Sequence, residues 1–494
     1  MKTKMNNLIK QLHTENARGA ASKLRSLLKE EGATEEFYEL CGGDFSCVRS
    51  LLEHEDAKVR KSGALLLGQL EDEDAVELLW NAYEKETQRF VKSSYLKAMQ
   101  NLDCEAILEK LRRRLQELYQ FEAKEEEEKH LREETHEMQK LLSLYEVNKG
   151  HAFIGNHRPS DLLLTMPYGY GQLLAKEYPG VLSKVMSLGV RMKNVCPDEV
   201  IDNPLYGEML FALHLESKIS LDAKSAARAL VKSDLKTILK HYHEGEEGFR
   251  FRVQLAGRME EKEKAKFLKA FIAETEKAFG GYLQNDPSDY EIEIRFYQTT
   301  SGLLQPFLKL FTIEERRFAY RSRILSTAMR PQLAALALTI ARTYLTEGAH
   351  VLDPLCGTGT LLIERYRQGR VGAAFGIDTY GEAIEAAMEN ATKADRRIHF
   401  IHRDYFDATF KEKFDELICE LPLAKQSAAE EEAFYQKFFD ATAKIMKPGA
   451  VVILLSTQGN RIKKQIRLHP QFSLKEEHLL RKKDELFEYI LRYK

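Results

Sequence analysis

The sequence predicts a multidomain protein in which an all-α region is followed by two α/β parts. Apolar residues recur at helical spacing over residues 1–120, short strands and helices follow over 150–325, and strands alternate regularly with helices over 326–494. The length of 494 residues is too great for one hydrophobic core and agrees with about three domains of ~100–200 residues each.

The first region, residues 1–120, has the pattern of successive helical pairs. An acidic turn precedes Val59-Arg60, and the same arrangement begins again at Val91-Lys92, 32 residues later. In both copies apolar residues follow in the same register: Ala64, Leu67 and Leu70, then Leu96, Met99 and Leu102. The pattern resembles HEAT-type repeats, whose units stack because none can bury its apolar face alone. An ordinary helical bundle is the alternative, and either would be a platform for a protein partner or a substrate.

Residues 121–149 are interpreted as a charged helical spacer. An acidic run extends from Glu122 to Lys129, and such a run is usually the solvated face of a helix. We assign this segment no function.

The middle region, residues 150–325, combines strands with turns and helices. The segment 162–171 predicts a strand and a Pro/Gly turn, and 249–255 and 290–296 show the period-two alternation of strands on either side of a helix over 262–279. With the apolar segment 306–311, this order resembles a THUMP-like α/β module, which implies RNA binding.

A basic cluster with interleaved aromatic residues ends the middle region. Phe318 and Tyr320 lie among arginines, and the combination fits single-stranded RNA, where phosphates are neutralised and bases stack on rings. A linker packed between two domains has the same composition, but we favour RNA contact because the segment leads into the last region. The candidate RNA-binding residues are Arg316, Arg317, Arg321, Arg323 and Arg330.

The last region, residues 326–494, predicts a parallel sheet with helices on both faces. Predicted strands at 373–377, 398–401, 416–419 and 450–455 are separated in most cases by predicted helices such as 382–391 and 429–446. The final pair of strands, 474–480 and 487–493, reads as an antiparallel hairpin, which an ordinary dinucleotide-binding sheet lacks.

The stretch from Val351 to Glu364 joins a buried strand to a helix through a turn with two glycines. Such a turn lets backbone approach a ligand closely. Asp353 at the strand end would repel a phosphate and favours a cationic ligand, and the lack of a Lys-Ser/Thr pair excludes a P-loop. A tight turn without a ligand is the alternative.

The segment Asp-Pro-Leu-Cys-Gly-Thr-Gly-Thr (353–360) resembles the Asp-Pro-x-Cys-Gly-Ser-Gly-Thr signature of the putative RNA methylase family. These are class I methyltransferases that use S-adenosylmethionine (SAM) and are often linked to a THUMP domain. Their sheet ends in an antiparallel hairpin. The resemblance implies that the methionine part of SAM contacts Asp353, Pro354, Cys356, Gly357, Gly359 and Thr360.

Two further acidic residues follow successive strands. The resemblance implies that Asp378 accepts hydrogen bonds from the ribose hydroxyls and that Asp404 meets the adenine amino group. Ligands of open α/β sheets bind beyond the carboxyl ends of the strands, where these residues lie. Aspartates are also common as helix caps, so each one alone has a simple structural explanation.

The fourth strand end departs from the family pattern. Amino-methylating relatives have Asn or Asp, two prolines and an aromatic residue there, so that the target amino group is held and the flipped base is stacked. This chain has Glu420-Leu421-Pro422-Leu423. Glu420 and Pro422 are the catalytic candidates, but no ring follows them unless Tyr405, Phe406 or another aromatic residue supplies one.

Composition sets limits on partners and location. The formal charge of −2 gives no global basic bias, so nucleic-acid contacts must come from local patches. The six cysteines show no metal-binding spacing and fit a reducing compartment, and neither a metal nor a disulfide framework is expected. No apolar run approaches the ~18 residues of a membrane span, and we expect a cytoplasmic protein without membrane contact.

The sequence thus predicts a SAM-dependent methyltransferase that acts on a base nitrogen in tRNA or rRNA. The alternatives are a catalytically degenerate SAM-binding scaffold that acts through its helical repeats, and a protein or DNA methyltransferase, which the same fold would accommodate.

Overall fold

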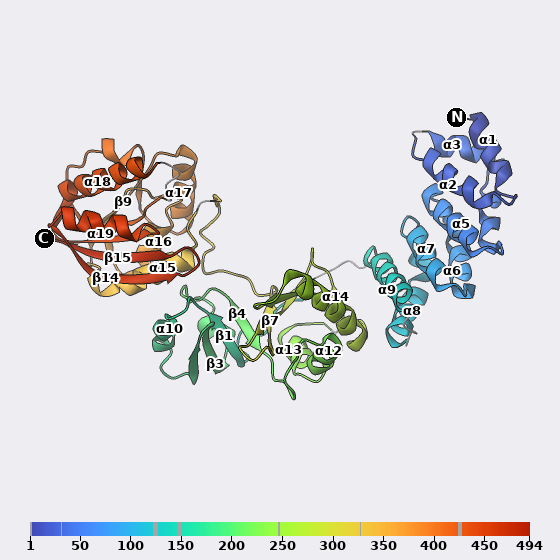
Figure 1. Cartoon of the computed structure of the whole chain (residues 1–494), viewed down its shortest axis with the longest axis horizontal. Coiled ribbons are helices and arrows are strands. Elements are labelled where there is room, and N and C mark those ends of the chain that lie inside the picture. Colours follow the sequence, from blue (N-terminus) through green and yellow to red (C-terminus); the bar gives the residue numbers. More distant parts are fainter. Residues whose placement is uncertain are drawn as a thin grey trace. The chain divides into compact units, whose positions relative to one another are not determined.

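The computed structural model describes residues 2–30, 32–121, 127–145, 150–245, 248–326, 328–422 and 427–494 (Figure 1). The chain forms two compact units. Unit 1 consists of Met1–Ala152, Leu213–Pro306 and Leu310–Thr312, and unit 2 consists of Phe153–Ala212, Phe307–Lys309 and Ile313–Lys494. The middle of the sequence therefore contributes to both units.

The start of unit 1 confirms the all-α prediction. Its helices are α1 (Lys2–Gln11), α2 (Ala17–Leu27), α3 (Ala33–Leu40), α4 (Ser46–Arg49), η1 (Ser50–Glu53), α5 (Ala57–Leu70), η2 (Glu73–Ala75), α6 (Val76–Lys85), α7 (Arg89–Met99), η3 (Glu105–Ile107), α8 (Leu108–Gln120) and α9 (Glu128–Ser143). Helix α2 packs on α5, α5 on α7 and α7 on α9. Stacked repeats share this arrangement, but the HEAT type itself stays a prediction.

Side chains at the start of α5 explain why the chain turns there. Asp56 caps the helix by accepting the Lys58 N–H at 2.8 Å. Arg60 donates two hydrogen bonds to the carboxylate of Glu86, at 2.7 and 2.8 Å, and binds the His54 carbonyl. Asp56 of the acidic turn is therefore a helix cap, and Arg60 connects the start of α5 to Glu86 at the end of α6.

Helix α9 lies within the segment that the sequence presents as a spacer. Met138 and Leu141 of this helix are buried in the same hydrophobic core as the helices before it. Most of the acidic run, residues 122–126, lies outside the described residues.

Gly68 marks the closest approach of α5 to α7. A Cβ atom added to Gly68 would lie 2.5 Å from the Ala98 Cα, so a larger residue requires the two helices to separate. We expect Gly68→Ala to destabilise the helical region by about 2 kcal/mol, the scale of overpacking, although alanine favours a helix by ~1 kcal/mol over glycine. Hydrogen exchange in peptides from α5 and α7 measures the change.

The exposed Lys58 of the same helix provides the control. Lys58→Ala should leave exchange unchanged within about 0.5 kcal/mol. Slower exchange in Gly68→Ala would show that helix propensity outweighs the contact and would contradict the packing.

The middle region contains strands and helices, as predicted, but it contributes them to both units, and the THUMP-like module over 150–325 stays a prediction. Unit 2 holds β2, β3, β1 and β4 side by side, all antiparallel, and β4 also pairs with Phe307 and Leu308 of β8. In unit 1, β5 lies between β6 and β7 and runs parallel to both. The bounds are β1 (Ser160–Thr165), α10 (Gly171–Glu177), β2 (Ser183–Met186), β3 (Gly189–Val195), α11 (Pro197–Val200), β4 (Met209–Ala212), α12 (Ala223–Val231), α13 (Leu235–Tyr242), β5 (Phe249–Ala256), α14 (Glu261–Ala278), β6 (Leu283–Asn285), β7 (Ile292–Gln298) and β8 (Leu304–Leu310).

The rest of unit 2 holds the sheet that positions the candidate site. Its strands are β9 (Ala349–Asp353), β10 (Val371–Asp378), β11 (His399–His402), β12 (Phe414–Glu420), β13 (Met446–Ser456), β14 (Phe472–Arg481) and β15 (Leu486–Tyr493). Its helices are α15 (Pro331–Ile340), η4 (Ala341–Tyr344), α16 (Thr360–Arg365), η5 (Tyr366–Gln368), α17 (Gly381–Lys393), η6 (Tyr405–Asp407), α18 (Ala428–Ile445) and α19 (Gly459–Leu468).

The strand order of this sheet is β11-β10-β9-β12-β13-β15-β14. The strands from β11 to β13 are parallel, and β15 runs antiparallel to both β13 and β14. The predicted parallel sheet and final hairpin are therefore confirmed. The chain moves outward from β9 to β11 and then returns to β12, so the order reverses between β9 and β12, where such sheets bind ligands.

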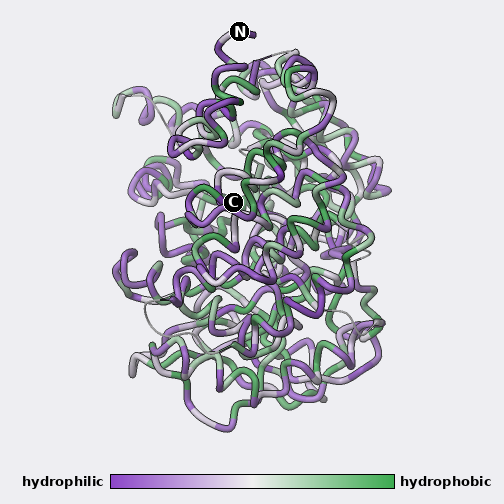
Figure 2. Tube along the Cα trace, turned by 90° about the vertical axis from the view of Figure 1, so that its right-hand side faces the viewer, coloured by the Kyte–Doolittle hydropathy of each residue, from purple (hydrophilic) through white to green (hydrophobic). Residues whose placement is uncertain are grey.

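In the described part of the chain, no helix combines the length and apolar character needed to cross a membrane. Figure 2 shows short hydrophobic segments alternating with hydrophilic ones along the trace. This is the pattern of helices and strands that each bury one face.

Candidate functional site

The turn between β9 and α16 is held by backbone hydrogen bonds. The Cys356 N–H donates to the Ile377 carbonyl and the Gly359 N–H donates to the Cys356 carbonyl, both at 2.8 Å. Gly357 and Gly359 have φ angles of +49° and +79°, which residues with a side chain rarely adopt. The glycines therefore fix the shape of the turn.

Space for a ligand adjoins the turn at Gly357. A Cβ atom added to Gly357 would meet no atom within 4 Å. Pro354 and Thr360, before and after the glycines, are buried. Burial raises the pKa of the Cys356 thiol well above its usual range, so this cysteine is neutral and packs as part of the turn.

Asp353 ends β9 with only 1% of its surface exposed. One carboxylate oxygen accepts the Leu355 N–H at 3.2 Å. Burial raises the pKa of Asp353 well above its usual range, the Leu355 N–H opposes this rise, and the charges of Asp378 and Glu420 add to it. A buried acid with two acidic neighbours is a site that a cation would stabilise.

Asp378 ends β10 and is tied to the same turn. Its two carboxylate oxygens accept the N–H groups of Gly357 and Tyr380, each at 2.9 Å. The predicted residues Asp353, Asp378 and the turn glycines therefore come together at one edge of the sheet.

Asp404 lies beyond the end of β11 and is exposed. It caps η6, since one carboxylate oxygen accepts the Phe406 N–H at 2.9 Å. The structure thus shows the capping role that the sequence left open, and a contact with adenine stays a prediction.

Glu420 ends β12, the strand next to β9. Burial raises its pKa above the usual range, the nearby Arg481 opposes the rise, and Asp484 adds to it. Leu421 continues the strand by donating its N–H to the Leu455 carbonyl at 2.8 Å, and Pro422 is exposed. Leu423 lies outside the described residues.

Tyr405 and Phe406, the two rings considered for stacking on a target base near the end of β12, differ in exposure. Tyr405 is buried and its hydroxyl lies 3.1 Å from that of Thr442, so it does not offer a face to a base. Phe406 is half-buried, and the Lys437 ammonium lies 4.1 Å from its ring centre. Phe406 is therefore the more exposed of the two rings, but the Lys437 ammonium covers one of its faces.

Two of the five arginines predicted to bind RNA require correction. Arg317 is buried: its guanidinium donates to the Tyr206 carbonyl at 2.7 Å, pairs with Glu315 and stacks on the Tyr206 ring. Arg323 lies within 3.5 Å of three carboxylates on α17, those of Glu382, Glu385 and Glu389. The basic character of the segment in the sequence does not show that these arginines have partners elsewhere in the same chain.

The remaining three arginines differ in exposure. Arg316 and Arg330 are exposed, and Arg321 is half-buried with a hydrogen bond to the Met329 carbonyl. The interleaved rings were also wrongly assigned to base stacking, because Phe318 and Tyr320 are buried and the Tyr320 hydroxyl donates to Glu364 at 2.8 Å.

Asn390 is a positioning residue that the sequence analysis did not identify. It is buried in α17, where its amide donates to the Thr358 carbonyl in the turn at 3.3 Å. Its side-chain oxygen accepts the N–H groups of Ser322 and Arg323. The sequence feature that could have identified Asn390 is its place on the apolar side of a helix, because an asparagine buried there needs polar partners.

Comparison with known proteins places this site in a methyltransferase context. Residues 319–483 match the family model described as RMKL-like, methyltransferase domain. TrmN from Thermus thermophilus is 20% identical, with a TM-score of 0.53 over 68% of this chain and 99% of its own. SMU.472, solved as a complex with SAH, is 13% identical, with a TM-score of 0.50 over 68% of this chain and 98% of its own. The chain therefore carries a methyltransferase-like domain in its C-terminal part.

Proposed function

We propose that the protein transfers the methyl group of SAM to a base nitrogen in tRNA or rRNA. The observation that carries this proposal is the meeting of Asp353, Asp378 and the open glycine turn where the strand order reverses. A buried carboxylate beside two other acids suits the positive charge of SAM. The SMU.472 complex with SAH, the demethylated form of SAM, supports the same ligand class.

The residues fit SAM in the following way. Asp353 holds the amino group of the methionine part, and the backbone from Cys356 to Gly359 lies against it. Asp378 orients the ribose through its remaining acceptor capacity, and Asp404 accepts from the adenine amino group. Bound SAM would supply the methyl group on a sulfonium that leaves as a thioether. Glu420 accepts a hydrogen bond from the target nitrogen, and Pro422 shapes the turn that presents it.

RNA is the substrate class that the resemblance favours. Arg316, Arg321 and Arg330 are the arginines that we retain for phosphate contact, which positions RNA without reading its sequence. The test is single-turnover transfer of labelled methyl from SAM to RNA, DNA and protein isolated from cells that lack the gene. We expect label in RNA alone. Label in DNA or protein would refute the RNA assignment, and SAM binding without transfer to any acceptor would support a scaffold.

The raised pKa of Asp353 predicts how SAM affinity depends on pH. A cation favours the ionised carboxylate, so binding is strongest above the pKa of the free protein and weakens as pH falls through it, by up to about tenfold per unit. Calorimetry at a series of pH values above the usual range of an aspartate measures this dependence. Asp353→Asn should bind weakly at every pH, and a wild-type affinity that rises on acidification would contradict the assignment.

A further inference from the structure

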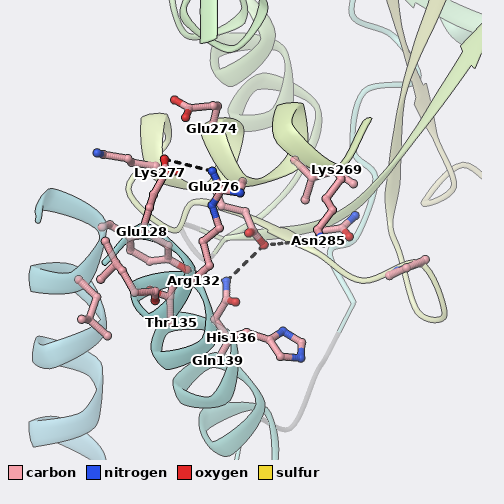
Figure 3. Close-up of a pocket in the computed structure, with 16 residues that line it drawn as sticks. Glu128, Arg132, Thr135, His136, Gln139, Lys269, Glu274, Glu276, Lys277 and Asn285 are labelled. Atoms are coloured by element: carbon pink, nitrogen blue, oxygen red, sulfur yellow. Dashed lines mark hydrogen bonds and ion pairs between the residues drawn. The ribbon is translucent and has the colours of Figure 1, made fainter. Parts of the chain in front are cut away.

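Unit 1 contains a cavity of about 430 Å³ between the end of the helical region and the middle α/β elements (Figure 3). Its walls come from α8, α9, α14 and the segment at and after β6. The volume lies in the range of sites that hold small ligands. The Tyr119 ring of α8 packs directly against Gly281, so the two sides of the cavity are held together.

The residues of α14 and α9 that line the cavity are regularly spaced along each helix. On α14, Lys269, Ile272, Ala273 and Glu276 recur at intervals of three and four residues, and on α9 the same holds for Leu131, Thr135 and Gln139. One face of each helix therefore points into the cavity. Tyr119, Leu131 and Ile272 supply much of the apolar lining.

Glu276 is the polar centre of this cavity. One carboxylate oxygen accepts the Asn285 N–H at 2.8 Å and the Gln139 amide at 3.3 Å, as Figure 3 shows. Among the described residues, the second oxygen has no donor within hydrogen-bonding distance. Burial raises the pKa of Glu276, with both hydrogen bonds opposing the rise. A ligand with an N–H donor would satisfy the second oxygen.

Two lysines flank this acceptor on α14. Lys269 and Lys277 both line the cavity and are exposed, and neither forms an ion pair with any residue in the described ranges. They are eight residues apart and thus separated by about 12 Å along the helix. Arg132, which also lines the cavity, is instead paired with Glu128 at 3.1 Å. The two ammonium groups can form ion pairs with the phosphates on either side of one nucleotide.

We propose that this cavity binds one unpaired, amino-bearing nucleotide of the RNA substrate, with its amino group on Glu276 and its flanking phosphates on Lys269 and Lys277. The flat base would lie against the apolar lining formed by Tyr119, Leu131 and Ile272. Adenine, cytosine and guanine carry an exocyclic amino group, whereas uracil presents a carbonyl oxygen at the matching position. The cavity would thus hold the RNA at a point other than the methylated base. This inference rests on the proposed function.

Fluorescence anisotropy of the full-length protein with short oligo(A), oligo(C) and oligo(U) tests the site without SAM. We expect Lys269→Ala/Lys277→Ala to weaken binding of all three RNAs about 10-fold. The matched control is Lys262→Ala/Lys266→Ala, which removes two exposed lysines of the same helix that do not line the cavity. Equal losses in both double variants would overturn the assignment, because they would reflect net charge alone.

Glu276→Gln tests the base contact. Glutamine keeps the oxygen that accepts from Asn285 but places an NH₂ group at the second position. We expect affinity for oligo(A) and oligo(C) to fall about 10-fold relative to oligo(U), the scale of one buried hydrogen bond. An unchanged order of affinities would refute the contact, and AMP binding as tightly as oligo(A) would assign the cavity to a free nucleotide instead of RNA.

These measurements separate the two proposals. RNA binding that the lysine and Glu276 variants leave unchanged, together with methyl transfer to RNA by the wild type, would overturn only the cavity assignment. RNA binding that follows the lysine and Glu276 variants would support the cavity even if the methyl acceptor proves different.

Discussion

Asp353→Asn lowers the affinity for SAM by about 10- to 100-fold, the scale of one charged hydrogen bond of ~1.5–3 kcal/mol. Asn has the shape of Asp and can still accept the Leu355 N–H, so the turn is retained. It lacks the negative charge that the cationic ligand requires. Calorimetry with SAM measures the loss directly.

The same substitution should not destabilise the fold. A carboxylate buried beside Asp378 and Glu420 is costly to ionise, as its raised pKa shows, so a neutral amide removes that cost. We therefore expect thermal stability that is equal or higher while SAM binding is weakened. Replacing a binding-site residue commonly stabilises the fold while it weakens the function.

Asp440→Asn is the matched control for Asp353→Asn. Asp440 lies on α18, is half exposed and pairs with His469 at 3.0 Å. This variant should bind SAM as the wild type does. Equal SAM affinities for the wild type and Asp353→Asn would remove Asp353 from the cofactor site, and a wild type that does not bind SAM would end the proposed function.

The sheet around Asp353 could be predicted because each of its strands carries a local signal. Apolar runs bounded by turns mark β9, β10, β12 and β13, and the hairpin β14–β15 follows from two runs around a polar turn. Acidic residues at strand ends then meet at one edge because parallel strands share their direction. Helix α19 was missed, since its buried apolar side consists of little more than Ile462 and the partly buried Ile466.

Burial of charged residues could not be predicted in the same way. Arg317 and Arg316 are neighbours with the same side chain, yet one is buried against Tyr206 and the other is exposed. The difference depends on a tertiary contact with a segment more than a hundred residues earlier. The cavity around Glu276 was missed for the same reason, because its walls come from distant segments that no local pattern connects.

Glu420→Gln separates an active enzyme from a scaffold. Glu420 lies at the end of β12, beside β9 with Asp353, and Leu421 fixes its backbone by pairing with Leu455. If its carboxylate accepts from the target nitrogen, the amide variant should reduce the single-turnover rate by about 100-fold, the scale of a positioned proton acceptor. SAM affinity should fall far less than the rate, because Asp353 and Asp378 keep their charges and the substitution preserves the size of the side chain.

The pH dependence of the rate gives an independent readout of Glu420. Burial raises its pKa, and only the ionised form can accept a proton, so the wild-type rate should increase as pH rises through that pKa and then level off. The residual rate of Glu420→Gln should not show this increase with pH. Glu412→Gln is the control, because Glu412 is exposed and precedes the same strand. Equal rates for wild type and Glu420→Gln would exclude Glu420 from catalysis, whereas SAM binding without transfer by either protein would identify a scaffold.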